Sequence, residues 1–393
     1  MKRLLIVGAS DLQLPAIQKA KEMGMYVGVA DFNPKAIGIS YADEYFNVST
    51  IDEEGIYCAA KAFGADGIMT LATDMPMRSV AYATQKLGLP GITYDTAVKA
   101  TDKSEMIKSF EAANVEHPWY IILSELSEVE NVFDKVTYPC ISKPVDNAGS
   151  RGVVLVNSEQ ELRQAVKYSS SNGRNGKVIL EEYLEGREVS VEVIVIKGIV
   201  HILQVTDKLT TGAPHFVEMG HSQPCSLSKE NIQAICDLAS RAVKAVGIEN
   251  GPAHVEIMFT EKGPRMIELG ARMGGDCITT HLVPLSTGID MVKATIMLAL
   301  GENPDISNQL HCGSAIRFFD VSQGVIRNIT GLDEAAEIEG VRQITMTKKV
   351  GDPVGTVGSS VDRVGYVIAQ AENAEKAVSV CEKAIEMVDI AVR

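Results

Sequence analysis

Apolar residues near the N-terminus occur in two short runs that flank a segment with helical spacing. Residues 2–9 form an apolar run that reaches Gly8, apolar positions recur at helical spacing from Leu14 to Met23, and YVGVADF repeats the apolar run. The order strand, glycine turn, helix, strand predicts the start of a parallel, doubly wound α/β unit. The segment lacks a complete G-x-G-x-x-G fingerprint, so the pattern does not predict a dinucleotide site.

Similar patterns extend this unit to about Val98. DGIMTL has the composition of a buried strand, and residues 75–87 have helical spacing that ends at Gly88. Glycine is favoured just past a helix because it adopts the left-handed conformation readily. We therefore expect a first domain over residues 1–98.

The following segment combines predicted helices with a glycine-containing loop. Residues 100–114 read as one helix, residues 118–123 as a strand and residues 125–136 as another helix. YPCISKPVDNAGSRGVVLV then predicts a strand that carries Lys143, a loop over residues 146–152 and a returning strand. Backbone N–H groups in such a loop can hold phosphate oxygens, and a lysine on the entering strand can reach the same oxygens. A plain hairpin loop is the competing interpretation.

Two further strands are predicted in KVILEEYLEGREVSVEVIV, on either side of residues 184–187. In the second strand Glu188, Ser190 and Glu192 share one face, and valines share the other. We expect the valine face to belong to the core and the acidic face to meet something polar. A solvent-exposed face is the alternative, above all for Glu192.

Residues 208–224, KLTTGAPHFVEMGHSQP, have no sustained period and contain glycines and prolines, among them Pro214. They predict a loop whose His and Glu side chains suit substrate contact. His215, Glu218 and His221 form a conceivable zinc set, but a mixed loop is not the helical H-E-x-x-H arrangement, so zinc is disfavoured.

Residues 253–281 contain two short strand patterns, HVEIMF and PRMIEL, joined by a loop EKG with glycine last. A hairpin centred on Lys262 places Glu256 opposite Glu268, because position 262 lies midway between them. Like charges opposite each other destabilise a sheet, so the pair calls for a cation. Mg²⁺ is oxygen-bound and often takes one or two carboxylates together with phosphates. The pair is therefore a candidate metal site, with an edge hairpin of solvated glutamates as the alternative.

The last part of the chain, residues 309–393, looks like a separate α/β unit. CGSAIRFFDV, GVIRNIT, VRQITMT and VGYVIAQA are strand-like, and Asn373 can cap a final helix with one apolar face. Two further helices are predicted upstream of it, over residues 231–246 and 291–300. We find no catalytic cluster in the C-terminal unit.

Composition narrows the class of protein. A chain of 393 residues exceeds one simple core and predicts about two to four domains, and 46% apolar with 22% charged residues is ordinary for a globular protein. The formal charge of −14 disfavours nucleic acids and anionic membrane surfaces as partners. The seven cysteines lack metal-type spacing and fit reduced thiols. With neither a signal-peptide pattern nor an apolar run of roughly 20 residues, we expect a cytoplasmic protein.

In their order, these segments resemble the ATP-grasp superfamily across residues 1–301. The resemblance implies a multidomain α/β fold: a Rossmann-like pre-ATP-grasp domain over residues 1–98, a two-lobed ATP-grasp clamp over residues 99–305 and a small C-terminal α/β domain over residues 306–393. The small lobe of the clamp is expected at about residues 115–186. It also implies that ATP binds between the lobes with Mg²⁺, or with Mn²⁺ in its place.

The resemblance also implies roles for single residues. Lys103 in TDKSEM and Lys143 in ISKPV match two phosphate-contacting lysines, and residues 146–152 match a flexible phosphate loop. Glu256 and Glu268 match the magnesium carboxylates. The residues implied to contact ATP, from the phosphate loop through the adenine hinge to the ribose contact and the adenine pocket, are Lys103, Ile141, Lys143, Gly149, Ser150, Arg151, Glu181, Tyr183, Leu184, Glu188 and Met258.

Within the superfamily the chain is most similar to the L-amino-acid ligase branch. HFVEMGH, IELGARMGGD and the unit after GENP carry this similarity. The resemblance places substrate contacts at Glu218, His221, Arg272, Gly275 and Asp276. Many superfamily members have asparagine where this chain has Gly270, which leaves the coordination of a second metal open.

The implied activity is that of an ATP-dependent, ADP-forming carboxylate–amine ligase that acts through an acyl phosphate on amino acids or similar small molecules. Lys143 would hold phosphate and Arg272 would stabilise the oxyanion and the departing phosphate. Glu218 and His221 are both candidates for the general base. The rival interpretations are a carboxylase-like, phosphoribosyl-glycinamide-type or carbamoyl-phosphate-like ATP-grasp enzyme, and a nucleotide-binding module without chemistry. The expected partners are a small-molecule carboxylate and an amine, and a homodimer stays open.

Overall fold

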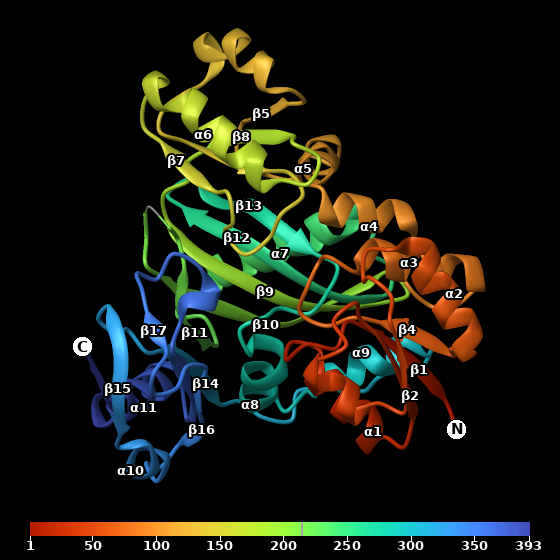
Figure 1. The fold of residues 1–393 in the computed structure, drawn as a ribbon. Helices are drawn as coiled ribbons and strands as arrows, with labels where there is room; N and C mark the ends of the chain where they lie inside the picture. Colours follow the sequence, from red (N-terminus) through yellow and green to blue (C-terminus); the bar gives the residue numbers. More distant parts are fainter. Residues whose placement is uncertain (214) are drawn as a thin grey trace.

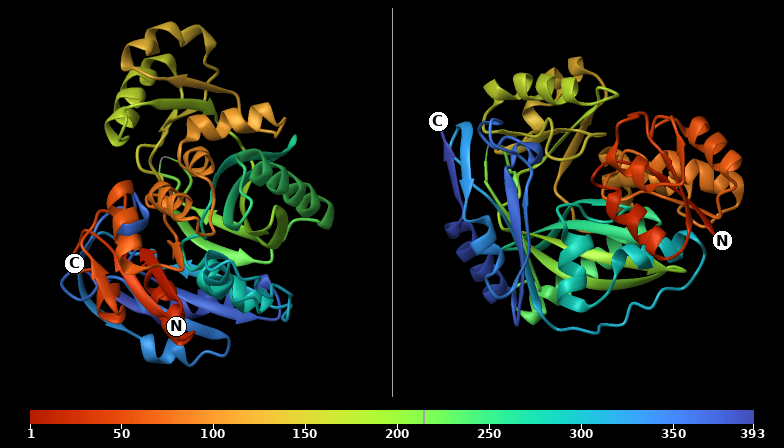
Figure 2. Two further views of the ribbon diagram at one scale, coloured as in Figure 1. Left: turned by 90° about the vertical axis from the view of Figure 1, so that its right-hand side faces the viewer. Right: turned by 60° about the horizontal axis from the view of Figure 1, so that its bottom comes forward.

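The computed structural model describes residues 1–213 and 215–393. Pro214, part of the predicted substrate loop, lies outside the described residues. The predicted multidomain α/β fold is confirmed: a parallel sheet near the N-terminus, a small antiparallel sheet and a large antiparallel sheet follow one another along the chain (Figure 1). The N-terminal sheet and the C-terminal part lie at opposite ends of the molecule (Figures 1 and 2).

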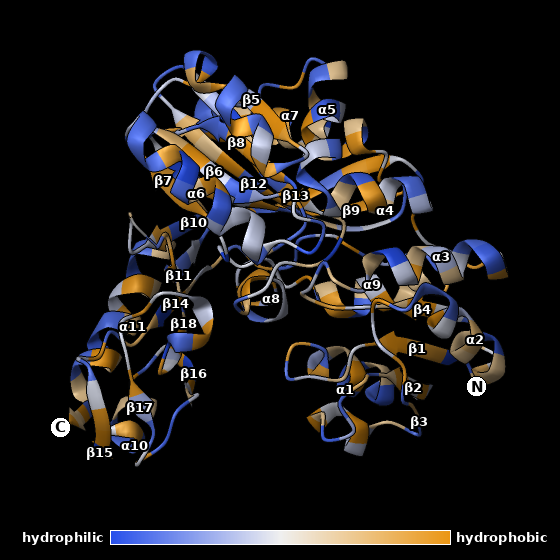
Figure 3. Ribbon diagram, turned by 45° about the horizontal axis from the view of Figure 1, so that its top comes forward, coloured by the Kyte–Doolittle hydropathy of each residue, from blue (hydrophilic) through white to orange (hydrophobic). Residues whose placement is uncertain are grey.

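The N-terminal unit has the predicted alternation of strands and helices. Its four strands are parallel and lie in the order β3-β2-β1-β4. Figure 3 shows apolar residues along β1, and Gly8, just after that strand, has a φ of +98°. The side chain of Gln13 packs against Gly8, and the Asp31 carboxylate accepts a hydrogen bond from the Ala9 N–H. The elements are β1 (Arg3–Val7), α1 (Leu14–Glu22), β2 (Tyr26–Ala30), η1 (Ile37–Tyr41), β3 (Glu44–Phe46), α2 (Glu53–Phe63), β4 (Gly67–Met69) and α3 (Met77–Leu87).

The predicted helix over residues 100–114 is wrong in one respect, because the chain forms two helices there. Asp102 adopts an extended conformation between them and its carboxylate accepts hydrogen bonds from the N–H groups of Ser104 and Glu105. An aspartate at this position favours a new helix start, since it satisfies N–H groups that have no partner within the helix. Lys103 therefore begins a helix. The two helices are α4 (Tyr94–Thr101) and α5 (Lys103–Ala112).

A small lobe follows, built on a four-stranded antiparallel sheet in the order β5-β8-β6-β7. One predicted element is wrong: residues 125–136 form two short 3₁₀ helices in place of one α-helix. Such short turns match the small number of buried side chains there, mainly Val129 and Val132. The elements are β5 (Tyr120–Leu123), η2 (Leu126–Asn131), η3 (Phe133–Lys135), β6 (Cys140–Pro144), β7 (Val154–Val156), α6 (Glu159–Asn172) and β8 (Val178–Glu182).

The large sheet has eight antiparallel strands in the order β13-β12-β9-β10-β11-β14-β18-β16. The valines of β9 pack with the apolar face of α7 in one core cluster, as the alternation predicts. The acidic face of β9 is not exposed to solvent: Glu192 is fully buried, so its solvent-exposed alternative is wrong. The elements up to residue 299 are β9 (Arg187–Ile196), β10 (Ile199–Thr210), β11 (Glu218–Gln223), α7 (Lys229–Val246), β12 (Gly251–Thr260), β13 (Gly263–Gly270), η4 (Ile278–Leu282), α8 (Val283–Thr287) and α9 (Met291–Ala299).

The predicted loop over residues 208–224 is largely wrong. β10 continues to Thr210 and β11 begins at Glu218, so only a short connection separates two paired strands. Glycines and prolines favour a loop in this segment, although Gly220 pairs with Leu209 within the sheet. Glu218 and His221 are consequently strand residues with fixed neighbours.

The C-terminal part contributes to two sheets: three of its strands continue the large sheet, and three others form a separate three-stranded sheet in the order β17-β15-β19. β14 pairs with β11, β18 with β14, and β16 with β18. As expected, Asn373 caps the last helix by accepting a hydrogen bond from the Lys376 N–H. The domain divisions at residues 98 and 305 stay predictions. The elements are β14 (Gly313–Phe318), β15 (Gly324–Thr330), α10 (Leu332–Ala336), β16 (Val341–Met346), β17 (Pro353–Val354), η5 (Ser360–Asp362), β18 (Gly365–Ala371), α11 (Ala374–Met387) and β19 (Asp389–Val392).

Among the described residues, no single helix combines the length and hydrophobicity needed to cross a membrane. The bent pair Ile278–Thr287 and Met291–Ala299 meets that requirement only when the two helices are counted together.

A close approach between β14 and α11 gives a stability prediction. A Cβ added to Gly313 would overlap the backbone carbonyl of Asn373, which begins α11. We expect Gly313→Ala to destabilise the fold by about 1–3 kcal/mol or more, because backbone on both sides would have to shift. The midpoint of urea unfolding measures the change. Gly355→Ala, in open space of the same part of the chain, is the matched control, and equal midpoints for the two variants would contradict the expectation.

Candidate active site

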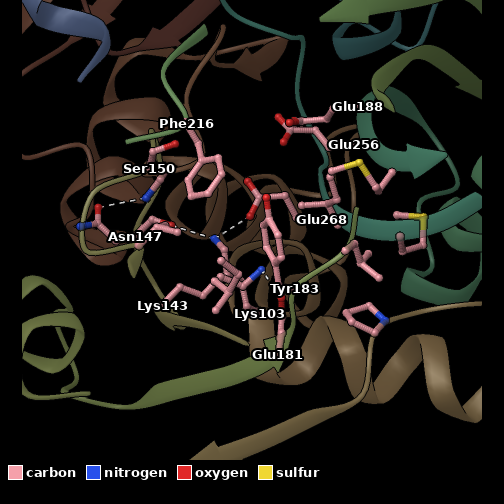
Figure 4. Close-up of a pocket in the computed structure, with 18 of the residues that line it drawn as sticks. Lys103, Lys143, Asn147, Ser150, Glu181, Tyr183, Glu188, Phe216, Glu256 and Glu268 are labelled. Atoms are coloured by element: carbon pink, nitrogen blue, oxygen red, sulfur yellow. Dashed lines mark hydrogen bonds and ion pairs between the residues drawn. The ribbon is translucent and has the colours of Figure 1, made fainter. Parts of the chain in front are cut away.

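A cavity lies where the small lobe faces the large sheet (Figure 4). Every residue that the resemblance assigned to ATP contact lines this cavity, and so do both candidate metal carboxylates. Of the candidate substrate residues, only Glu218 lines it. The lining comes from α5, the small lobe, the segment after β8 and the large sheet. It includes Lys103, Ile141, Lys143, Gly149, Ser150, Arg151, Glu181, Tyr183, Leu184, Glu188, Glu218, Glu256, Met258 and Glu268.

Apolar side chains from both lobes line part of the cavity. Ile141 projects from β6, while Met258 and Met266 belong to the paired strands β12 and β13. Tyr183 follows the end of β8, and its ring lies 6.3 Å from that of Phe216. Two apolar walls that face each other suit a flat aromatic group, because they remove both of its faces from water.

The polar end of this region is organised by Lys143. Its Nζ lies 2.6 Å from Oε2 of Glu181, and both side chains are buried. The contact follows from the sheet register: Ile141 pairs with Glu181, so Lys143 is its diagonal neighbour on the same face. The structure thus directs Lys143 toward Glu181.

Lys103 links three parts of the cavity. Its Nζ lies 2.9 Å from Oε2 of Glu268 and donates a 2.8 Å hydrogen bond to the carbonyl oxygen of Asn147 in the loop over residues 146–152 (Figure 4). Burial opposes the charge, but the nearby Glu268 carboxylate outweighs it and raises the pKa of Lys103. Lys103 is therefore a fixed cation beside the loop.

The loop over residues 146–152 is held at its base and open at its tip. Asp146 accepts hydrogen bonds from the N–H groups of Arg174 and Asn175. Gly149 and Ser150 have φ values of +68° and +56°, and the position of Gly149 has open space around it. Consecutive left-handed residues turn neighbouring N–H groups toward one side, which suits an anion.

Glu256 and Glu268 pair directly across β12 and β13, as the sequence predicts, but the turn differs from the expected one. Thr260 pairs with Gly263, so the loop has two residues, and the register shifts between Glu256 and Ile257. One extra residue on β13 then restores the expected pair. Such a bulge is common next to functional sites because it redirects a side chain.

Behind Glu256 lies a buried chain of polar groups. His254 Nε2 is 3.2 Å from Oε1 of Glu256, and His254 Nδ1 is 3.0 Å from Oε2 of Glu192. Burial lowers the pKa of His254, yet the adjacent Glu192 carboxylate dominates and raises the pKa to about 9. A Cβ on Gly274 would lie 2.7 Å from His254 Nδ1, so the glycine leaves room for this chain.

Lys208, which the sequence reasoning missed as a site residue, lies among three of these carboxylates. Its buried Nζ contacts Glu188, lies 3.4 Å from Glu256 and lies 3.6 Å from Glu218. Burial opposes its charge, but the three carboxylates raise the pKa of Lys208 well above its ordinary value. The same contact holds the pKa of Glu256 well below its usual range against the opposing effect of burial. Asp207 pairs with Val189, and continuing that register by one residue would have placed Lys208 opposite Glu188.

Asp74 is a second residue without a sequence prediction. It follows β4, and its carboxylate receives Nε and Nη2 of Arg272 at 3.1 and 2.9 Å. Arg272 does not line the main cavity but an adjoining one, together with Lys103 and Glu268. A Cβ on Gly270 would lie 2.6 Å from Oδ1 of Asp74, so the Asp74–Arg272 pair occupies the space beside Gly270. A carboxylate at the C-terminal end of a parallel strand is the signal that could have identified Asp74.

The remaining candidate substrate residues form a second cluster. His221 is buried, and its Nε2 lies 3.3 Å from Oδ2 of Asp276, which follows Gly275. Arg363, from the C-terminal part, pairs with both oxygens of Asp276 at 2.7 Å. Within the described residues, no group of three or more His, Cys, Asp or Glu side chains is arranged to hold a metal, so the zinc interpretation of His215, Glu218 and His221 gains no support.

The donor set fits a hard divalent cation beside a triphosphate. Glu256 and Glu268 offer oxygen ligands from directly opposed positions, and magnesium prefers oxygen ligands. Lys103 and Lys208 lie against these carboxylates, and a lysine ammonium group can also hold phosphate. Apolar side chains, lysine cations and the loop over residues 146–152 therefore meet in one cavity.

Two families of known domains match the chain. The ATP-grasp domain matches residues 136–280, and the L-amino acid ligase C-terminal domain 2 matches residues 317–393. The relative y4rH of Sinorhizobium fredii, an uncharacterised protein, is 28% identical over 84% of this chain and 69% of its own length. Alanine–anticapsin ligase of Bacillus subtilis is 27% identical over 74% of this chain and 66% of its own length. The chain thus spans about two thirds of the length of both curated relatives.

Among solved structures, the L-amino acid ligase of Bacillus licheniformis superposes with a TM-score of 0.87 at 23% identity, covering 100% of this chain and 99% of that one. This likeness concerns the fold.

Proposed function

We propose, from the premise that this chain is an ATP-grasp ligase carrying the L-amino acid ligase C-terminal domain 2, that it joins a small-molecule carboxylate to an amine through an acyl phosphate. The substrates we propose are amino acids or similar small molecules. The observation that carries the proposal is the convergence of Lys103, Glu256 and Glu268 on one cavity that also has an apolar slot. Coupled carboxylate activation needs cations at the phosphates and a dry cavity for the reacting groups.

In this proposal the chain positions the nucleotide before any chemistry occurs. Ile141 and Met258 enclose the adenine, the backbone after Glu181 contacts its edge and Glu188 contacts the ribose. Lys103 and Lys143 hold phosphates together with the N–H groups of the loop over residues 146–152. Both lysines are charge-paired with glutamates and already largely buried, so phosphate would replace or share an existing partner without a further cost of burying the lysine.

Magnesium held by Glu256 and Glu268 would neutralise charge on the transferring phosphoryl group. The substrate carboxylate attacks the terminal phosphorus of ATP, the bond to the bridging oxygen breaks, and ADP leaves. The amine then attacks the acyl carbon and phosphate departs. Arg272 stabilises the oxyanion that develops, because its guanidinium is held in place by Asp74 beside Glu268. Glu218, which lines the cavity, is better placed than buried His221 to take the proton of the amine.

A screen of substrate pairs tests the proposal. Purified protein with MgATP is incubated with pairs of amino acids and with small carboxylates plus amines, and released ADP and phosphate are measured. We expect ADP release that requires both a carboxylate and an amine, with a product one water lighter than the pair. Release that depends instead on bicarbonate or formate would favour the carboxylase-like or purine-type rivals. ATP binding without ADP release for every pair would favour the non-catalytic module.

A further inference from the structure

The C-terminal part contributes nothing to the nucleotide cavity. Among the described residues that line the cavity, none follows Glu268 in the sequence. Yet β14 pairs with β11, with Gly220 opposite Arg317 and His221 opposite Ile316. The part beyond residue 312 is therefore built directly against the strand that carries two candidate substrate residues.

One side chain of that part reaches back to the site. Arg363, just before β18, is 8% exposed, and its guanidinium lies 3.7 Å over the ring of Phe318. Its Nη1 and Nη2 donate 2.7 Å hydrogen bonds to the two oxygens of Asp276, and Nη1 also donates to the carbonyl oxygen of Glu218 at 3.0 Å. Nε donates to the carbonyl oxygen of Ser360. All three guanidinium nitrogens are thus used.

The groups that Arg363 joins come from two separate segments of the candidate substrate site. Glu218 begins β11, whereas Asp276 ends the turn that follows Arg272. Asp276 and Cys277 have φ values of +49° and +61°, a conformation that non-glycine residues keep only when their surroundings fix it. Gly274 and Gly275 precede them, and their carbonyl oxygens accept hydrogen bonds from the Thr279 hydroxyl and the Ile278 N–H, so the start of the turn is held from within. The end of the turn at Asp276 is held by a residue of another part of the chain. The Arg363–Asp276 pair supplies the fixed point.

The charge pattern supports a positioning role. Burial works against ionised Asp276, but the hydrogen bonds from Arg363 and His221 hold the pKa of its carboxyl well below the usual range. The Asp276 carboxylate is thus an anion that contacts the buried guanidinium of Arg363 and the His221 imidazole. A planar guanidinium fixes both the distance and the orientation of a carboxylate, which an ammonium group cannot do.

We propose that Arg363 is a positioning residue for the amino-acid substrate: by fixing Asp276 and the backbone of Glu218 together, it makes the C-terminal part a wall of the substrate site. This inference rests on the proposed ligase function. It assigns to the C-terminal part the selection of the substrate, while nucleotide binding belongs to the rest of the chain.

A double-mutant cycle tests the inference. Arg363→Met, Asp276→Asn and the double variant are compared with the wild type for the KM of the amino-acid substrate, the KM of ATP and kcat. We expect each single change to raise the amino-acid KM about 10- to 100-fold and to leave the KM of ATP within about threefold, because only the substrate turn is displaced. The double variant should resemble the single ones, because the two side chains act as a unit. Arg363→Lys should recover part of the loss by restoring the charge without the planar geometry.

Controls separate this role from a general contribution to stability. Arg342→Met removes an exposed arginine of the same part of the chain, whose partner is Gln370, and should change none of the three constants. Additive effects of Arg363→Met and Asp276→Asn, or equal rises in the KM of ATP and of the amino acid, would overturn the inference.

The positioning role of Arg363 can still be tested if the proposed ligase function is wrong. A wild type that releases no ADP with any pair contradicts the proposed function alone. In that case hydrogen–deuterium exchange measures directly how firmly the Arg363–Asp276 pair holds the two segments. Faster exchange in peptides spanning residues 274–281 and 218–223 of Arg363→Met, with unchanged exchange in α7, would support the fixed point, and unchanged exchange in those peptides would overturn it.

Discussion

Replacement of Glu268 by glutamine is expected to abolish ADP formation and to leave ATP binding measurable. Glu268 lies opposite Glu256 and 2.9 Å from Lys103. Glutamine keeps the shape but removes one of the two charges that would hold a divalent cation. Stabilisation of phosphoryl transfer by a metal is worth several kcal/mol, so kcat should fall on the order of 10³-fold. ATP binding persists because the apolar slot and the phosphate loop are unchanged.

Two measurements check this result. Coupled ADP detection gives kcat, and calorimetry gives the affinity for ATP and for Mn²⁺ with ATP. Glu261→Gln, which changes an exposed glutamate in the turn of the same hairpin, is the matched control and should behave like the wild type. Undiminished turnover in Glu268→Gln would remove the metal assignment.

Replacement of Lys208 by methionine is expected to impair both activity and folding. The buried ammonium is shared by Glu188, Glu218 and Glu256, so its loss leaves three carboxylates close together. At least one of them should then take up a proton, and Glu256 would become a poorer metal ligand. We expect kcat to fall by about 10²-fold or more and the free energy of unfolding to fall by about 3–5 kcal/mol.

A second substitution distinguishes the two effects. Lys208→Met with Glu188→Gln removes one unpaired charge and should recover part of the stability in urea unfolding without restoring kcat. Lys229→Met, at the exposed start of α7, is the control for removing a lysine and should match the wild type. A Lys208→Met enzyme with wild-type kcat would show that the cation takes no part in the site.

The sequence predicts correctly that Glu256 lies opposite Glu268, although it predicts the wrong length for the turn between them. The expected three-residue turn is wrong, yet Glu256 still meets Glu268 because a bulge near Ile257 compensates. Bulges leave no local signal in a single sequence, since they depend on what packs against both faces of the sheet. The correct prediction that Glu256 pairs with Glu268 therefore rests on the alternation of side chains along the strands and not on the turn.

Other parts of the site could not be predicted because they depend on pairing between distant segments. The glycines and prolines around Thr211 predict a loop, and only the partner strands show that β10 and β11 pair there. The same pattern predicts Lys208 as the start of that loop, although it lies within β10. The Asp74–Arg272 contact joins residues 198 positions apart, a distance over which local patterns carry no information. The roles of the single residues in binding and catalysis stay predictions.

The shared sheet limits how relatives could be recombined. A foreign C-terminal segment cannot simply be fused after α9, because it must bring a strand that hydrogen-bonds to β11 in the same register as β14 does. Its side chain opposite Gly220 must also fit the space that Arg317 fills, because a Cβ on Gly220 would lie 2.6 Å from the Arg317 guanidinium. Chimeras of this chain therefore need crossover points upstream of β11 or single-residue changes, because the C-terminal part shares a sheet with the strands that precede it.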